Sequence, residues 1–183
     1  MKMTLAEIRK EIDEIDPQIK ALFLQRMEVA KHVAEVKYAS GDEIYKADRE
    51  AEIISRLTVD VAPELKMEYT AIIRKIMEVA RKYEYGLIYD WNPEVAAEFI
   101  KDAQESQNGY VKVRMVRPNQ VNSMSSILSM IGDYGFHMKQ ITLQEENTEE
   151  VKFELVICGD INTEEMKKLI YQLSKESKDF EVL

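Results

Sequence analysis

The sequence predicts two parts of different fold class, an all-helical part over residues 1–90 and an α+β part over residues 109–183. In the first part apolar residues recur at alternating steps of three and four, the spacing of one face of a helix. After Gly109 the period changes, and strand-like segments with apolar residues at every second position alternate with shorter helical segments. Residues 91–108 are expected to form a linker with a short helix.

The first helix should begin after Thr4 and continue to about Tyr38. Thr4 and Glu7 have the spacing of a capping box. The apolar stripe of this helix consists of Leu5, Ile8, Ile12, Ile15, Ile19, Leu22, Val29, Val33 and Val36. Such a stripe is typical of a helix that packs against other helices. Pro17 removes one backbone hydrogen bond, so we expect a kink or a break there.

Two further helices complete the helical part. The second is expected at residues 46–57, and the third begins at Pro63, a residue favoured in the first turn of a helix. The third helix has its own apolar seam, formed by Tyr69, Ile73, Ile76, Ala80, Tyr83 and Leu87. Trp91-Asn92-Pro93 then interrupts the pattern, and residues 93–105 are expected to form a polar connecting helix.

The α+β part is predicted to have the element order βαββαβ. Its strands are expected at residues 110–116, 136–143, 151–158 and 180–183, and its helices at residues 123–134 and 163–174. This order is the ferredoxin-like arrangement, in which two helices cover one face of an antiparallel sheet.

Arg26 occupies a position of the first apolar stripe where a leucine or isoleucine is expected. A lone arginine there most often keeps its stem on the stripe and its head in water. Lys37 follows eleven residues later, so it points within about 20° of Arg26 at roughly 16 Å along the axis. Two such side chains can converge on a small anion. Arg9 lies about 25 Å from Arg26 on the same helix, so a second subunit must supply it if it takes part.

Two carboxylates accompany these cations. Glu50 shares a face of the second helix with apolar residues, although an exposed edge position would also explain it. Ala80 is the small residue of the third seam, and Glu84 follows it by one turn. Space beside a carboxylate is what a ligand cavity needs, although a close helix crossing also accounts for the alanine.

Composition excludes several classes of function. The net charge of −9 and the pI near 4.9 argue against nucleic acid or an anionic membrane as partner. The amino terminus is charged and amphipathic, so neither a signal peptide nor a transmembrane span is expected. Cys158 is the only cysteine and the two histidines lie far apart, so we expect no disulfide, no metal site and a cytoplasmic location.

Residues 5–86 resemble the all-helical chorismate mutases. That family has an arginine near the start of a long first helix, a second arginine in its middle and a lysine near its end. An Arg-Glu pair follows on the second helix, and a small residue and a Gln or Glu follow on the third. The corresponding residues here are Arg9, Arg26, Lys37, Arg49, Glu50, Ala80 and Glu84. The resemblance implies an intertwined three-helix homodimer with shared active sites, which agrees with the assignment of Arg9 to a second subunit.

The resemblance also implies a reaction, the Claisen rearrangement of chorismate to prephenate in phenylalanine and tyrosine biosynthesis, with no cofactor. The partner's Arg9 and Arg26 would bind the two carboxylates of chorismate. Lys37 and Glu84 would donate to the ether oxygen, and Glu50 would accept from the ring hydroxyl.

Two residues depart from the family pattern. Lys46 stands where many relatives have an aspartate shortly before the Arg-Glu pair, and Arg49 of that pair would support the substrate carboxylates from nearby. Glu84 stands where many relatives have glutamine, and a carboxyl group can donate to the ether oxygen only while it is protonated. Its pKa must therefore be raised by burial and by the charge of the substrate.

Residues 109–183 resemble an ACT domain, a regulatory module of amino-acid biosynthetic enzymes. Residues 122–128, Asn-Ser-Met-Ser-Ser-Ile-Leu, correspond to its Gly-Ala-Leu-x-x-Ile-Leu motif, and residues 135–138 to its Gly-x-Asn-Ile turn. Asn122 replaces a glycine, and asparagine tolerates the left-handed conformation. The resemblance implies an aromatic amino-acid effector bound near Asn122, Ser123, Met124 and His137 at the interface of two modules. A purely structural dimerisation module is the alternative.

Two other functions fit the same residues. Isochorismate pyruvate lyases share the helical fold and much of the cationic pocket, but a fused amino-acid-sensing module favours prephenate formation. A catalytically inactive sensor that regulates a partner enzyme is the other alternative. The full set of charged residues argues against it, whereas Lys46 and Glu84 favour it.

Overall fold

The computed structural model describes residues 3–101 and 109–183 of the 183-residue chain. Its amino-terminal part contains α1 (Leu5–Ser40), α2 (Ala47–Leu57) and α3 (Lys66–Trp91), with a 3₁₀ turn at Pro63–Leu65 before α3. The three predicted helices are therefore confirmed. The capping box is also present, because the Thr4 hydroxyl accepts from the Glu7 N–H while the Glu7 carboxylate accepts from the Thr4 N–H. Gly41 ends α1 in the left-handed conformation, with φ 70°.

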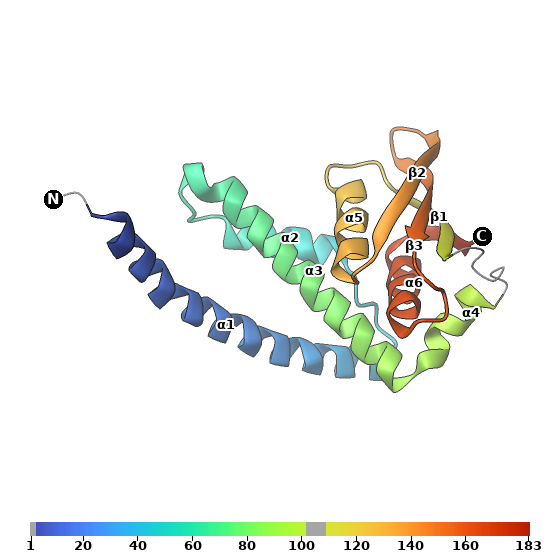
Figure 1. Cartoon of the computed structure of the whole chain (residues 1–183), viewed down its shortest axis with the longest axis horizontal. Coiled ribbons are helices and arrows are strands. Elements are labelled where there is room, and N and C mark those ends of the chain that lie inside the picture. Colours follow the sequence, from blue (N-terminus) through green and yellow to red (C-terminus); the bar gives the residue numbers. More distant parts are fainter. Residues whose placement is uncertain (1–2, 102–108) are drawn as a thin grey trace.

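Pro17 does not break α1, so the expectation of a break is wrong. The helix is continuous from Leu5 to Ser40 and curves smoothly along its length (Figure 1). Proline removes one hydrogen bond and crowds the carbonyl four residues earlier. Gentle bending over several turns relieves that crowding without ending the helix.

The apolar stripe of α1 is not covered within one chain, so the expected packing of this stripe against other helices stays a prediction that one chain does not test. Leu5 is 61% exposed and Leu22 is 66% exposed, and the stripe residues between them are exposed as well. α1 packs against α3 only through its carboxyl-terminal half, where Ala30 and Ala34 are buried. Figure 1 shows the amino-terminal half of α1 extending away from the rest of the chain.

The connection after α3 is short and partly helical. Residues Pro93–Ala96 form a 3₁₀ turn and α4 covers Ala97–Ile100. The predicted connecting helix extended to residue 105, and its last part lies outside the described residues.

The carboxyl-terminal part has the predicted order βαββαβ. Its elements are β1 (Tyr110–Pro118), α5 (Ser123–Asp133), β2 (His137–Glu146), β3 (Glu150–Cys158), α6 (Glu164–Glu176) and β4 (Lys178–Val182). The strands form one antiparallel sheet in the order β2-β3-β1-β4. Alternate residues of β1 and β3, such as Val113 and Phe153, are fully buried against the helices.

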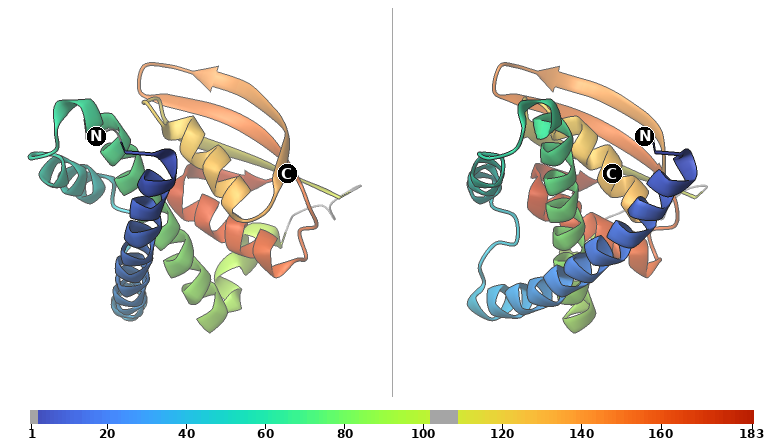
Figure 2. Two further views of the ribbon diagram at one scale, coloured as in Figure 1. Left: turned by 60° about the vertical axis from the view of Figure 1, so that its left-hand side comes forward. Right: turned by 90° about the vertical axis from the view of Figure 1, so that its left-hand side faces the viewer.

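The two parts pack through helices. α5 and α6 cover one face of the sheet, and α3 lies against the outer side of these two helices (Figure 2). Tyr85 and Ile88 of α3 form an apolar cluster with Tyr171 of α6, and the rings of Tyr85 and Tyr171 meet edge to face at 5.5 Å. None of the helices in the described ranges is long and apolar enough to cross a membrane.

Candidate active site

Glu84 is a buried carboxyl group on α3, one turn after the buried Ala80. The residue is 7% exposed, and no basic side chain of the described ranges forms an ion pair with it. Burial raises the pKa of Glu84 to about 7, an effect that the positive charges of Lys37 and Arg26 partly oppose. A carboxyl group with this pKa is protonated in a large fraction of molecules at neutral pH. It can therefore act as a hydrogen-bond donor.

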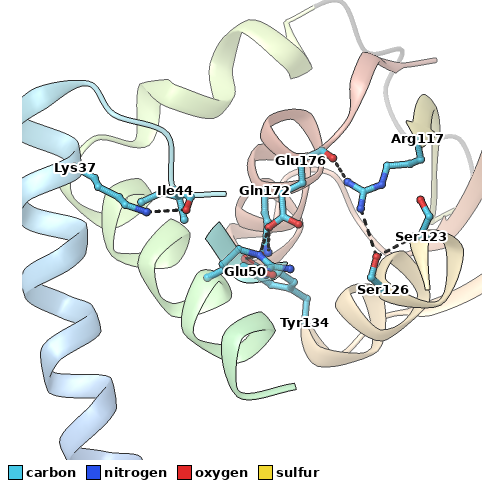
Figure 3. Close-up of polar contacts among 10 residues, drawn as sticks. Lys37, Ile44, Glu50, Arg117, Ser123, Ser126, Tyr134, Gln172 and Glu176 are labelled. Carbon is cyan, nitrogen blue, oxygen red and sulfur yellow. Dashed lines mark hydrogen bonds and ion pairs between the residues drawn. The ribbon is translucent and has the colours of Figure 1, made fainter. Parts of the chain in front are cut away.

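Lys37 and Arg26 lie on α1, which packs against α3, and the positive charge of each opposes the rise in the pKa of Glu84. Lys37 is half-buried, and its Nζ donates to the carbonyl oxygen of Ile44 at 2.7 Å (Figure 3). Arg26 is exposed and lies on the uncovered stripe of α1. These two cations and the neutral form of Glu84 give one surface that favours an anion with a hydrogen-bond acceptor.

Glu50 is held by an arginine that the sequence analysis did not select. Nη1 of Arg81 on α3 donates to the Glu50 carboxylate, which comes from α2, and the guanidinium lies over the Tyr45 ring at 4.7 Å. Glu50 is half-buried and also acts on the pKa of Glu84. The charges of Glu50 and Glu84 are therefore near each other, with Arg81 beside both.

Arg81 also joins the two parts of the chain. Its Nε donates to Glu176 on α6 at 3.0 Å, and the same carboxylate oxygen accepts from the Gln172 amide at 2.8 Å. The Tyr134 hydroxyl donates in turn to Gln172 (Figure 3). Although burial lowers the pKa of Arg81, the charges of Glu176 and Glu50 raise it above the ordinary value. Arg81, Glu176, Gln172 and Tyr134 are all buried, and their hydrogen bonds link the helical part to α5 and α6.

A sequence signal for Arg81 did exist. It follows the buried Met77 by four residues and precedes the buried Ile88 by seven, so it lies on an apolar stripe of α3. The reasoning that selected Arg26 on its stripe would have selected Arg81 as well. Its partner Glu176 lies 95 residues away, and no local pattern identifies it.

Two predicted residues do not join this group within one chain. Nη1 of Arg49 donates to Glu52 at 2.6 Å, and both side chains are exposed. Arg9 is exposed on the projecting half of α1. The charges of Lys37, Arg26 and Glu50 act on the pKa of Glu84, and Ala80 precedes Glu84 by one turn of α3. His, Cys, Asp and Glu side chains of residues 3–101 and 109–183 form no cluster of three suited to a metal ion.

The four predicted effector residues lie at two ends of α5. Asn122 precedes the helix in the left-handed conformation, with φ 70°, as its correspondence to a glycine predicted. Ser123 is buried and Met124 is half-buried in the first turn. His137 is exposed and begins β2, after the carboxyl end of α5. One chain does not bring His137 to the other three, so a site containing all four requires a second module.

Comparison with known proteins identifies the helical part. Residues 8–85, less than half of the chain, match the sequence model of the chorismate mutase type II family. A protein of Methanocaldococcus jannaschii named chorismate mutase is 49% identical over 53 residues, which are 29% of this chain and 54% of that protein. The chain thus spans about half the length of this relative. The amino-terminal part carries a chorismate mutase type II domain.

A solved structure titled "GqqA, a novel type of quorum quenching acylases" matches with a TM-score of 0.39 and 15% identity. The match covers 44% of this chain and 43% of that chain. A similarity at this level does not establish a shared fold or function.

Proposed function

We propose that the chain is a chorismate mutase that converts chorismate to prephenate. The observation that carries this proposal is the combination of the type II domain at residues 8–85 with the group of Arg26, Lys37 and Glu84 on facing helices. Chorismate is a dianion whose ether oxygen gains negative charge as its C–O bond breaks. Two cations and a neutral carboxyl donor suit that charge distribution.

The rearrangement is intramolecular and requires no nucleophile. The site would act by holding the compact conformer of chorismate and by stabilising the charge that separates in the transition state. Arg26 and the partner's Arg9 would bind the carboxylates, and Lys37 and Glu84 would donate to the ether oxygen. Glu50 would accept from the ring hydroxyl. Arg49, which is exposed beside Glu52, would contribute only positive charge at the edge of the site.

A homodimer with shared active sites is part of the proposal. The apolar stripe of α1 supports it, because six leucine and isoleucine residues from Leu5 to Leu22 are each more than 40% exposed in one chain. Exposed apolar residues in a continuous row at helical spacing are characteristic of an interface. A second α1 lying antiparallel along this row would bury it and would bring the partner's Arg9 toward Arg26.

The α+β part would be a regulatory module of the ACT type that binds an aromatic amino acid. The strand order β2-β3-β1-β4 and the left-handed Asn122 before α5 support this proposal. Arg81 offers a route for regulation, because it bonds to Glu50 in the proposed active site and to Glu176 in the module.

The proposal is tested by incubating the purified chain with chorismate and, separately, with isochorismate. Turnover of chorismate to prephenate is expected, whereas release of pyruvate from isochorismate alone would identify a lyase. The Arg26→Ala variant should lose at least a hundredfold in kcat/KM. Arg56→Ala, an exposed arginine at the end of α2, is the matched control and should keep activity. Absence of turnover with both substrates would contradict the proposal and favour a catalytically inactive sensor.

A further inference from the structure

Arg81 on α3 holds one oxygen of the Glu50 carboxylate and leaves the other able to bind a ligand. Its Nη1 donates to Oε1 of Glu50, so the second oxygen, Oε2, can still accept a hydrogen bond. The Glu50 side chain is 24% exposed, which allows a ligand to reach it. The adjacent Arg49 donates instead to Glu52 at 2.6 Å. Within the described residues, Arg81 is therefore the basic side chain that orients Glu50.

Arg81 is itself anchored by the α+β part. Its Nε donates to Oε1 of Glu176 at 3.0 Å, and the Glu176 side chain is 1% exposed. The same oxygen accepts from the Gln172 amide at 2.8 Å, and the Tyr134 hydroxyl donates to Gln172 at 2.9 Å (Figure 3). A guanidinium is planar and its N–H groups have fixed directions. Anchoring of Nε at Glu176 therefore also sets the direction in which Nη1 meets Glu50.

Packing alone does not explain an arginine at this position. Arg81 is 7% exposed and lies on the apolar stripe of α3 that contains Met77 and Ile88. An apolar side chain would fill this space without taking a charge out of water, and such replacements of buried ion pairs are often neutral or stabilising. A guanidinium, in contrast, holds two carboxylates in a fixed relative geometry. The contacts therefore indicate that Arg81 positions Glu50.

We propose that Arg81 is a positioning residue for substrate recognition, and that Glu176 of the α+β part supports it in the absence of any effector. Arg81 holds Oε1 of Glu50 so that Oε2 is oriented to accept from the ring hydroxyl of chorismate. This inference rests on the proposed function, in which Glu50 accepts from that hydroxyl. The α+β part then contributes to substrate discrimination by the basal enzyme and not only to its regulation.

The test compares chorismate with the analogue in which hydrogen replaces the ring hydroxyl. The ratio of the two kcat/KM values, measured with the full-length chain, reports how much the hydroxyl contributes to transition-state binding. Wild type should favour chorismate by about tenfold or more. Arg81→Gln and Arg81→Lys should each lower this ratio about threefold or more, because neither side chain can hold both carboxylates as the guanidinium does. The ratio does not depend on the fraction of folded enzyme, so a loss of stability alone leaves it unchanged.

Further variants separate positioning from general packing. Arg81→Gln should change the ratio by less than about twofold when Glu50 is already alanine, because Arg81 acts through Glu50. Glu176→Gln should lower the ratio about threefold, although this residue does not touch the substrate. Asp133→Asn is the matched control, because it removes a different ion pair between α3 and α5, formed with Lys75 Nζ at 2.6 Å. This variant should keep the wild-type ratio.

The inference is overturned if wild type turns over chorismate and either Glu176→Gln or a folded Arg81 variant keeps the wild-type ratio. It is also overturned if Asp133→Asn lowers the ratio as much as Glu176→Gln does, or if an active wild type does not discriminate between the two compounds. If wild type binds chorismate without turnover, the proposed function fails alone, and the ratio of the two dissociation constants from calorimetry replaces the ratio of kcat/KM values. Absence of both turnover and binding would overturn both proposals.

Discussion

Glu84 can donate a hydrogen bond to the ether oxygen only while its carboxyl group is protonated. The pH dependence of activity is therefore the most direct test of the proposed site. Burial raises the pKa of Glu84 to about 7 in the chain without substrate. Above that pH the group ionises and can only accept hydrogen bonds. We expect kcat/KM, which reports the free enzyme, to fall about tenfold per pH unit above pH 7. At pH 9 the loss should be about a hundredfold.

Bound substrate should shift the pH at which half of the activity is lost. Chorismate brings two negative charges to the site, which disfavour ionisation of Glu84. The pH profile of kcat, which reports the bound enzyme, should therefore have its midpoint above that of kcat/KM. Glu84→Gln donates at every pH, so its activity should stay constant through the alkaline range. A wild-type profile that is flat to pH 9, or an inactive Glu84→Gln variant, would refute the assignment of Glu84 as the ether-oxygen donor.

The raised pKa of Glu84 also makes the free energy of unfolding depend on pH. The pKa of Glu84 rises from an ordinary 4.5 to about 7 on folding, a difference worth about 3 kcal/mol. Because the folded state holds the proton more tightly, this stability is fully present below pH 4.5 and is lost as pH rises to about 7. Glu84→Gln should therefore be more stable than wild type by up to about 3 kcal/mol at pH 8, and similar to it near pH 4.5. Urea unfolding at both pH values measures this, with Glu68→Gln, exposed on the same helix, as the control.

Further variants test the shared site and the link between the two parts. Arg26→Ala should abolish turnover while the circular dichroism spectrum and the dimer stay unchanged, because an exposed charge contributes little to packing. A large loss of stability with activity retained would instead show that Arg26 has a structural role. A mixture of Arg9→Ala and Arg26→Ala chains should regain activity, since one site of the hybrid dimer carries neither substitution. If activity does not return after subunit exchange has been verified, that result would count against a shared site. Glu176→Gln should cost about 3 kcal/mol in urea unfolding, because Arg81 stays buried with one carboxylate fewer. Glu164→Gln, exposed at the start of the same helix, should cost less than about 0.5 kcal/mol.

The sequence by itself determined the order and type of the elements. Thr4 and Glu7 marked the start of α1, and the change of period after Gly109 separated helices from strands. These features are local, because they depend on residues within a few positions of one another. The charged residues on helix faces, including Arg26 and Glu84, were found for the same reason.

Only the tertiary structure decided which groups meet and in what charge state. Glu50 bonds to Arg81 and Arg81 to Glu176, contacts that join residues 31 and 95 positions apart and that no local spacing encodes. The sequence required a raised pKa for Glu84, but the burial that supplies it depends on how α1 packs on α3. Pro17 was expected to kink or break α1, yet the helix is continuous from Leu5 to Ser40 and curves along its length. Packing sets the dielectric environment and the partners of each charge, and these are properties of distant segments brought together.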